Sequence, residues 1–170
     1  MTITADLFKR RFPRLLEKLG HSDLEILLKA LTRIDASSGE LLYGCGEHSD
    51  ALYMIWEGRL AFGVLIAGKD IFLGHIGPGQ FCGVTAVIEP GPALITATVA
   101  EPSVLLRLKH EELVALRETQ PRLCSNLLRA LSLDLVEWLR AYEAYMAERT
   151  QLGNIQDFFR MSRHLARLEE

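Results

Sequence analysis

The chain has too few cysteines, and these are too widely spaced, to form a disulfide framework or a zinc site. Cys45, Cys82 and Cys124 are odd in number and share no C-x-x-C spacing, which is typical of reduced thiols. A chain of 170 residues buries roughly 68–70% of the surface that its unfolded form exposes, so its core needs no covalent or metal staple. The sequence therefore predicts neither a metal site nor a bound cofactor.

Long apolar runs and an excess of positive charge are also missing. No run approaches the ~20 apolar residues that a membrane-spanning helix needs, and Asp6 stands where a signal peptide has its apolar stretch. Lys and Arg number 19 against 22 Asp and Glu, a formal net charge of −3, which does not attract a nucleic-acid backbone or an anionic membrane. We expect a cytoplasmic protein that contacts neither membrane nor nucleic acid directly.

The motifs that mark common enzyme classes are absent. The sequence contains no G-x-S-x-G elbow, no Walker loop and no acidic pair within a catalytic motif. His75 lies in a strand-like segment, where a hydrogen-bonded core histidine is a far more common role than a haem or metal ligand. The sequence therefore predicts a protein that is not an enzyme.

Two helical patterns come first along the chain. Residues 13–19 begin with proline and are followed by Gly20, which predicts a short helix. Ser22 and Glu25 have the spacing of a capping box, which predicts a second helix over residues 23–31. We therefore expect the N-terminal part of the chain to be helical.

Short apolar runs then alternate with turns that contain glycine, proline or aspartate. Glycine provides the positive φ that tight turns require. This spacing predicts antiparallel strands that pack as a jelly roll or closed barrel, and hence an α+β fold class for the chain. The expected strands cover residues 40–43, 51–56, 59–66, 71–76, 96–99 and 104–108.

A second helical region follows the strands. Residues 111–116 predict a short helix, and Pro121 opens a run without glycine or proline as far as Gly153, which predicts one long helix.

Apolar residues recur along the long helix at spacings of four and three, the pattern that keeps one face towards a partner helix. We expect a homodimer through this face, and the alternative is an amphipathic helix that lies on its own domain. The expected dimer residues are Cys124, Leu128, Leu131, Leu135, Trp138, Tyr142 and Tyr145. Three leucines lie off this face and are expected to pack on the strands: Leu123, Leu127 and Leu139.

These patterns divide the chain into four expected segments. They are N-terminal helices (1–38), a β-roll (39–109), C-terminal helices that include the dimer helix (110–150) and an amphipathic tail (151–170). The tail carries three arginines and three acidic residues, so it lacks the basic excess of a DNA-binding element. Its apolar residues fall on one side of a final helix that folds back or binds another protein: Ile155, Phe158, Phe159, Leu165 and Leu168.

Three strings of residues resemble a known family. They are residues 46–58 (GEHSDALYMIWEG), residues 73–83 (LGHIGPGQFCG) and residues 97–99 (ATV). With the order of helices, strands and long helix, they resemble the cyclic nucleotide-binding domain of catabolite-activator-type regulators and of kinase regulatory subunits. The similarity covers about residues 23–145 and implies a β-roll that holds a ligand pocket.

The resemblance places the ligand in a phosphate-binding cassette, a short turn and helix before the ATV string. It implies a glutamate directly after Gly83, which accepts hydrogen bonds from the ribose, and an arginine shortly before Ala97, which pairs with the cyclic phosphate. Val84 and Ile95 occupy these two positions. Loss of one partner of a buried charge pair costs about 2–5 kcal/mol. We therefore expect this chain to bind cyclic nucleotide roughly 30- to several-thousand-fold more weakly than a family member that has the arginine. The candidate pocket residues are Phe81, Gly83, Val84, Thr85, Ile95 and Thr96.

The altered cassette leaves several interpretations open. In the first, apolar side chains fill the cavity, and the domain is a dimeric scaffold or regulator that acts on an unidentified protein partner. In the second, the pocket takes an uncharged effector, or an anion held weakly by backbone N–H groups. In the third, the chain is the effector-domain fragment of a catabolite-activator-type transcription regulator. The 20 residues after Thr150 are too few for a helix-turn-helix domain, so we expect no direct DNA binding by this chain. The side chains expected to fill the cavity are Val84, Val87, Ile88, Leu94 and Ile95.

Overall fold

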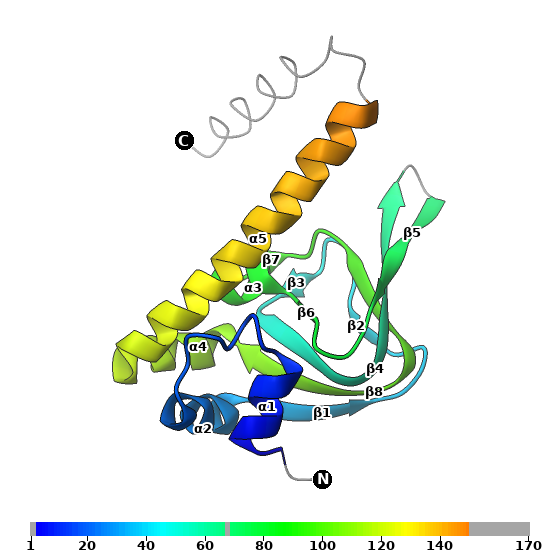
Figure 1. Ribbon diagram of the computed structural model, residues 1–170. Helices are drawn as coiled ribbons and strands as arrows, with labels where there is room; N and C mark the ends of the chain where they lie inside the picture. Colours follow the sequence, from blue (N-terminus) through cyan, green and yellow to red (C-terminus); the bar gives the residue numbers. More distant parts are fainter. Residues whose placement is uncertain (1–2, 67–68, 150–170) are drawn as a thin grey trace. The chain divides into compact units, whose positions relative to one another are not determined.

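The computed structural model describes residues 3–66 and 69–149 of the chain (Figure 1). The chain divides into two compact units, one up to Leu131 and the other from Ser132 onward, and the division falls within the last described helix. The tail expected over residues 151–170 lies outside the described residues. Among the described helices, none is both long enough and apolar enough to cross a membrane.

The first helix is not where the sequence predicts it. α1 (Ala5–Arg11) starts after Thr4, whose hydroxyl oxygen accepts a hydrogen bond from Leu7 N at 3.4 Å. Residues 13–18 form turns and Leu19 belongs to no helix, so the helix expected over residues 13–19 is wrong. Burial of the side chains in this segment outweighs its weak local preference for helix. The buried side chains are those of Leu15, Leu16 and Leu19.

The second helix, α2 (His21–Ala30), begins two residues before its expected start. It follows Gly20, whose N–H donates to a carboxylate oxygen of Asp23 at 3.0 Å. The capping box expected between Ser22 and Glu25 is therefore wrong. The Glu25 carboxylate instead lies 3.5 Å from His21 Nε2, one turn back along the same helix.

The strands are antiparallel and confirm the predicted roll with flanking helices. The described strands are β1 (Thr32–Ala36), β2 (Leu41–Tyr43), β3 (His48–Ser49), β4 (Ala51–Ile66), β5 (Lys69–Ile76), β6 (Phe81–Cys82), β7 (Gly91–Pro92) and β8 (Thr96–Lys109). β8 lies beside β1, β2 and β4, and β4 also pairs with β5 and β6. The two short strands β3 and β7 form a separate ladder.

Strand β1 lies within residues 1–38, the segment where the sequence predicts N-terminal helices. Arg33 and Asp35 form an exposed ion pair, with 2.6 Å between Arg33 Nη2 and Asp35 Oδ1. Ile34, between them, packs against the core of the roll. This alternation has the period of a strand. It covers only five residues, so the sequence pattern alone does not distinguish it from a continuation of the preceding helix.

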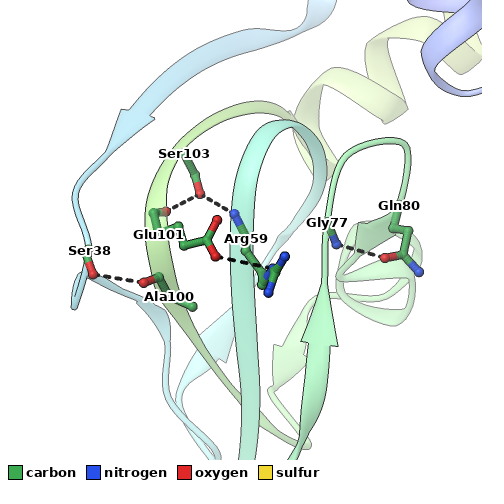
Figure 2. Close-up of polar contacts among 7 residues, drawn as sticks. All are labelled: Ser38, Arg59, Gly77, Gln80, Ala100, Glu101 and Ser103. Carbon is green, nitrogen blue, oxygen red and sulfur yellow. Dashed lines mark hydrogen bonds and ion pairs between the residues drawn. The ribbon is translucent and has the colours of Figure 1, made fainter.

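β4 and β8 are each one strand where the sequence predicts two. The turn expected at residues 57–58 is instead an irregularity within β4. Gly58 has a φ of 86° there, and a Cβ at this position would lie 2.2 Å from Ser103 Oγ on β8. The Ser103 hydroxyl accepts a hydrogen bond from Arg59 N at 3.0 Å and donates one to Glu101 O at 2.6 Å (Figure 2). The bond from Arg59 N joins β4 to β8 where their regular pairing is interrupted, and the bond to Glu101 O lies within β8.

The interior of the roll is an apolar cluster. On β4, the members that precede Gly58 are Tyr53 and Ile55, and those that follow are Leu60 and Phe62. The inward-facing set therefore changes from odd-numbered to even-numbered positions at the irregularity, as a bulge in a strand requires. The other buried members of the cluster are Ala36, Tyr43, Cys82, Ala97, Val99 and Leu105.

Three further helices complete the fold: α3 (Val84–Ile88), α4 (His110–Thr119) and α5 (Pro121–Arg149). Pro121 is the first residue of the long helix, as predicted. Leu123 and Leu127 are buried, as expected for residues that pack on the domain. Leu139 was expected to pack in the same way, and this is wrong, because its side chain is 48% exposed.

Candidate functional site

The cassette starts where the chain leaves β6 and turns into α3. β6 pairs with β4, which places Cys82 opposite Tyr53. Gly83 then adopts a φ of 82°, and a Cβ there would lie 2.1 Å from Ala51 O. Only glycine combines this left-handed conformation with so close an approach of two backbones. Gly83 thus fixes the position of α3 against β4.

The first turn of α3 buries apolar side chains. Val84 and Val87 are 7% and 0% exposed, whereas Thr85 is exposed. Val87 N donates to Gly83 O at 3.0 Å, and Glu89 N donates to Thr85 O at 2.8 Å, which close this short helix. The position where the resemblance implies a ribose-binding carboxylate therefore holds a buried hydrocarbon side chain with no acceptor.

The chain returns from α3 to β8 through a segment held by backbone hydrogen bonds. Ala93 N donates to Glu47 O at 2.8 Å, and Ala93 O accepts from Gly46 N at 2.7 Å. The Thr96 hydroxyl accepts a hydrogen bond from Cys45 N at 3.0 Å. One of the polar groups expected in the pocket thus already stabilises the loop before β3.

The two residues before Thr96 have different environments. Ile95 packs against the apolar cluster of the roll, in agreement with an apolar pocket position. Leu94 is 74% exposed, so the expectation that its side chain helps to close the cavity is wrong. Phe81, the first residue of β6, and Ile88, the last residue of α3, are both half-buried.

Three polar groups inside the roll were not singled out from the sequence. Burial raises the pKa of the Cys82 thiol to about 12, and burial, with Cys82 beside it, raises the pKa of Tyr43. Burial also raises the pKa of Tyr53, against the opposing effect of Arg107, which lies across from it on β8. The thiol and both phenols are therefore neutral at physiological pH. The alternation of residues along the strands was the signal that could have found Tyr53, since it shares a strand face with Ile55.

The cassette helix is linked directly to α4. His110 Nδ1 lies 2.9 Å from Val87 O, and His110 N donates to Asp50 O at 2.7 Å. The first residue of α4 therefore joins the end of the cassette helix to the start of β4. If α3 moves, either the contact between His110 Nδ1 and Val87 O breaks or His110 moves with α3.

The expected dimer face of α5 is only partly accessible. Cys124 and Leu131 are 1% and 0% exposed within the single chain, so the expectation that they meet a partner helix is wrong. Leu128 and Leu135 are half-buried, and Trp138 is 66% exposed. The side chains of Tyr142 and Tyr145 lie outside the described residues. The first turns of α5 pack on the domain because their apolar face continues its core.

Residues 33–120 match the family model described as "Cyclic nucleotide-binding domain". This segment contains the sheet, the cassette and α4, and it makes up about half of the chain. The chain belongs to the cyclic nucleotide-binding domain family.

Relatives with known roles or structures share this domain. A CRP-like cAMP-activated global transcriptional regulator of Mycobacterium tuberculosis is 27% identical over 112 residues, which are 65% of this chain and 50% of the relative. The N-terminal domain of a transcriptional regulator from Streptomyces coelicolor is 26% identical, with a TM-score of 0.66, and the match covers 73% of this chain and 89% of that domain. A cyclic nucleotide-binding domain from Methylobacillus flagellatus has a TM-score of 0.77 at 18% identity, with 86% of each chain covered. The chain spans about half the length of the curated relatives it matches.

The cassette of this cyclic nucleotide-binding domain is almost free of charge. From Phe81 to Val99 the sequence has a single charged residue, Glu89, and no lysine or arginine. Glu89 follows α3 and its side chain is exposed. The cassette therefore offers no cationic side chain to a phosphate.

Proposed function

We propose that this cyclic nucleotide-binding domain is a non-enzymatic, cytoplasmic regulatory or scaffold module that acts through protein contacts and does not bind cyclic nucleotide with high affinity. The observation that carries the proposal is the cassette without a cationic side chain, with Val84 buried and Ile95 packed into the roll. A cyclic phosphate in this place would lose its hydration without gaining a cation. An uncompensated buried charge is among the most costly arrangements in a protein.

The neutral groups inside the roll do not replace the missing cation. The Cys82 thiol and the Tyr43 hydroxyl stay protonated, because burial raises the pKa of both. A hydrogen bond from a neutral donor contributes about 0.5–1.5 kcal/mol, and one that involves a charged group about 1.5–3 kcal/mol. Two such donors therefore fall short of a bidentate arginine in both charge and geometry.

The proposed module is a homodimer, and α5 provides its contact surface. From Ser132 onward this helix exposes several large apolar side chains, which a second copy of the helix would cover. They are Leu133, Val136, Trp138 and Leu139. The expected dimer face also includes Leu128 and Leu135, which are both half-buried.

Calorimetric titration with cyclic AMP and cyclic GMP tests the proposal. We expect no binding tighter than the millimolar range for either nucleotide, which corresponds to about −4 kcal/mol. A dissociation constant in the micromolar range or below would overturn the proposal and identify the protein as a cyclic nucleotide receptor.

A second candidate function is the sensor half of a transcription regulator. It is favoured by the match to a CRP-like regulator from Mycobacterium tuberculosis over half of the length of that protein. An antibody against the purified chain separates the two candidates. A native product near 19.1 kDa supports the module, and a product about twice that size supports a regulator with a further domain.

A further inference from the structure

A shallow depression lies between α1 and the turn that connects β5 with β6. It has a volume of about 260 Å³ and mixes apolar and cationic side chains. Its lining residues are Leu7, Arg10, Arg11, Trp56 and Pro78. None of these belongs to the cassette or to α5, so no function has yet been assigned to this surface.

The α1 side of the depression is held in place by aromatic contacts. The Arg11 guanidinium lies 5.2 Å from the centre of the Trp56 ring, a cation–π contact. Phe12 packs against the same indole with 6.4 Å between ring centroids, and Phe8 packs on Phe12 at 5.6 Å. Phe8, Phe12 and Trp56 are buried, so the walls are preformed.

The opposite side is a tight turn fixed by four hydrogen bonds. Gly77 N donates to Gln80 Oε1 at 2.8 Å (Figure 2), and Gln80 N donates to Gly77 O at 3.1 Å. Gly79 N donates to Ile55 O, and Ile55 N donates to Gln80 O. A Cβ on Gly79 would lie 2.7 Å from Arg11 O, so the turn is pressed against the end of α1. Pro78 is therefore held rigidly opposite the arginines.

Positive charge is concentrated at this place in a chain of net negative charge. Five of the ten residues from 9 to 18 are lysine or arginine and one is acidic. Lys18 pairs with Glu17, and the Lys9 ammonium donates to Leu19 O at 2.8 Å. In the part of the chain that the structure describes, no acidic side chain lies within ion-pair distance of Arg10 or Arg11. Both guanidinium groups are exposed and lack an anion.

We propose that this depression binds an acidic peptide segment of a partner protein. Carboxylates of the segment pair with Arg10 and Arg11, since the guanidinium fork matches carboxylate geometry. An adjacent apolar side chain of the segment packs against Leu7 and Pro78, which are exposed. A preformed surface of this kind loses little conformational entropy when it binds.

The same observations argue against a nucleic acid as the occupant. Nucleic-acid affinity comes mainly from cations that neutralise several phosphates along a track. Here two guanidinium groups, of which that of Arg11 also contacts the Trp56 ring, flank apolar walls that suit a hydrocarbon side chain. The surface thus provides charge complementarity for a short acidic and apolar sequence.

Fluorescence anisotropy with a labelled peptide of sequence EEDLFEEL tests the proposal on the full chain. We expect micromolar binding at low salt, which weakens at about 0.5 M salt because exposed ion pairs are screened. The double substitution Arg10→Gln/Arg11→Gln is expected to weaken binding by about tenfold or more. Leu7→Ser is expected to weaken the binding of this peptide but not that of an all-glutamate peptide of equal length.

The matched control is Lys18→Gln/Lys29→Gln, which removes the same charge from outside the depression, and circular dichroism checks that each variant is folded. Undiminished binding by this control supports the site. The proposal is overturned if the wild type does not bind the peptide, or if the control loses as much affinity as the arginine variant. It is also overturned if a single-stranded oligonucleotide binds more tightly than the peptide and depends on the same arginines. These outcomes leave the proposed loss of cyclic nucleotide binding untouched, because the cassette is not involved.

Discussion

His110 Nδ1 lies 2.9 Å from the carbonyl oxygen of Val87, so the first side chain of α4 is bonded to the cassette helix. The backbone of His110 is bonded to Asp50 as well. In this domain α3 is therefore connected to β4 and to α4 through one residue. A change in the cassette would reach α4, and through it the start of α5, along this path.

Removal of the imidazole should loosen that connection. We expect His110→Ala to lower the free energy of unfolding by about 1 kcal/mol, because Val87 O loses its side-chain partner. Urea denaturation measures this change, and hydrogen exchange should show reduced protection of the amides in α3. His48→Ala, at an exposed position in β3, is the control. Equal effects of the two substitutions would show that the His110 contact has no special role.

The absence of lysine and arginine from the cassette predicts a gain of function by substitution. Val84→Glu combined with Ile95→Arg should raise the affinity for cyclic AMP by roughly 30-fold or more, because it restores the acceptor and the cation. The variant should also be less stable without ligand, since both side chains replaced are apolar and packed. Thermal shift with and without cyclic AMP measures both effects. Leu94→Arg adds the same positive charge at an exposed position and should show no response to ligand.

Two glycines with the same φ separate backbone strain from steric contact. Gly83 and Gly46 both have a φ of 82°, but a Cβ on Gly83 would lie 2.1 Å from Ala51 O and one on Gly46 would contact nothing within 4 Å. Gly46→Ala should therefore cost about 1–2 kcal/mol, from the left-handed conformation alone. Gly83→Ala should cost clearly more, because α3 has to move away from β4. Chemical denaturation of both variants checks this, and similar losses would contradict the close approach.

Stability should fall at alkaline pH. The Cys82 thiol has a pKa of about 12 in the folded chain, against 9.0 for an unperturbed thiol. The unfolded chain therefore releases this proton first, so the stabilisation is complete below about pH 9 and is lost as the pH rises towards 12. Tyr43, whose pKa is also raised, acts in the same direction. Urea denaturation at increasing pH should show a smaller loss of stability for Cys82→Ala than for the wild type, and equal losses would contradict this assignment.

Charge placed on the exposed face of α5 should disrupt the proposed dimer. We expect Trp138→Glu and Leu139→Glu to give folded monomers in light scattering, because a buried carboxylate in a helix pair would have no partner. Leu41→Glu is the control, since Leu41 is a similarly exposed apolar residue on β2. If the α5 variants stay dimeric, the interface lies elsewhere.

The sequence predicted the features of this fold that depend on local signals. The glycine-rich turns indicated the roll, and Pro121 marked the start of α5. The helix at residues 13–19 was wrong because its leucines are buried by tertiary packing in turns. The strand β1 was missed because a five-residue alternation is ambiguous next to a helix.

Of the candidate site, only the cassette could be predicted, because its residues follow one another in the sequence. Val84 and Ile95 could be placed through the glycine and the ATV string on either side of them. Arg107 and Tyr53 are neighbours across two strands, with 53 residues between them in the sequence, and no local pattern connects them. Arg11 and Pro78 come together for the same reason, since α1 and the turn after β5 meet only in the folded chain.

At Gly58 the inward-facing positions of β4 change from odd-numbered to even-numbered, and this limits how the length of the chain can vary during evolution. The number of residues between Ile55 and Leu60 determines which side chains of β4 after Gly58 point into the roll, since alternate residues of a strand point in opposite directions. Insertion or loss of one residue there would send Leu60 and Phe62 outward and bring their neighbours in, even though no side chain had been substituted. The length of this short stretch is therefore as constrained as the identity of Gly58, and natural variants should tolerate exchange of the other amino acids there more readily than gaps.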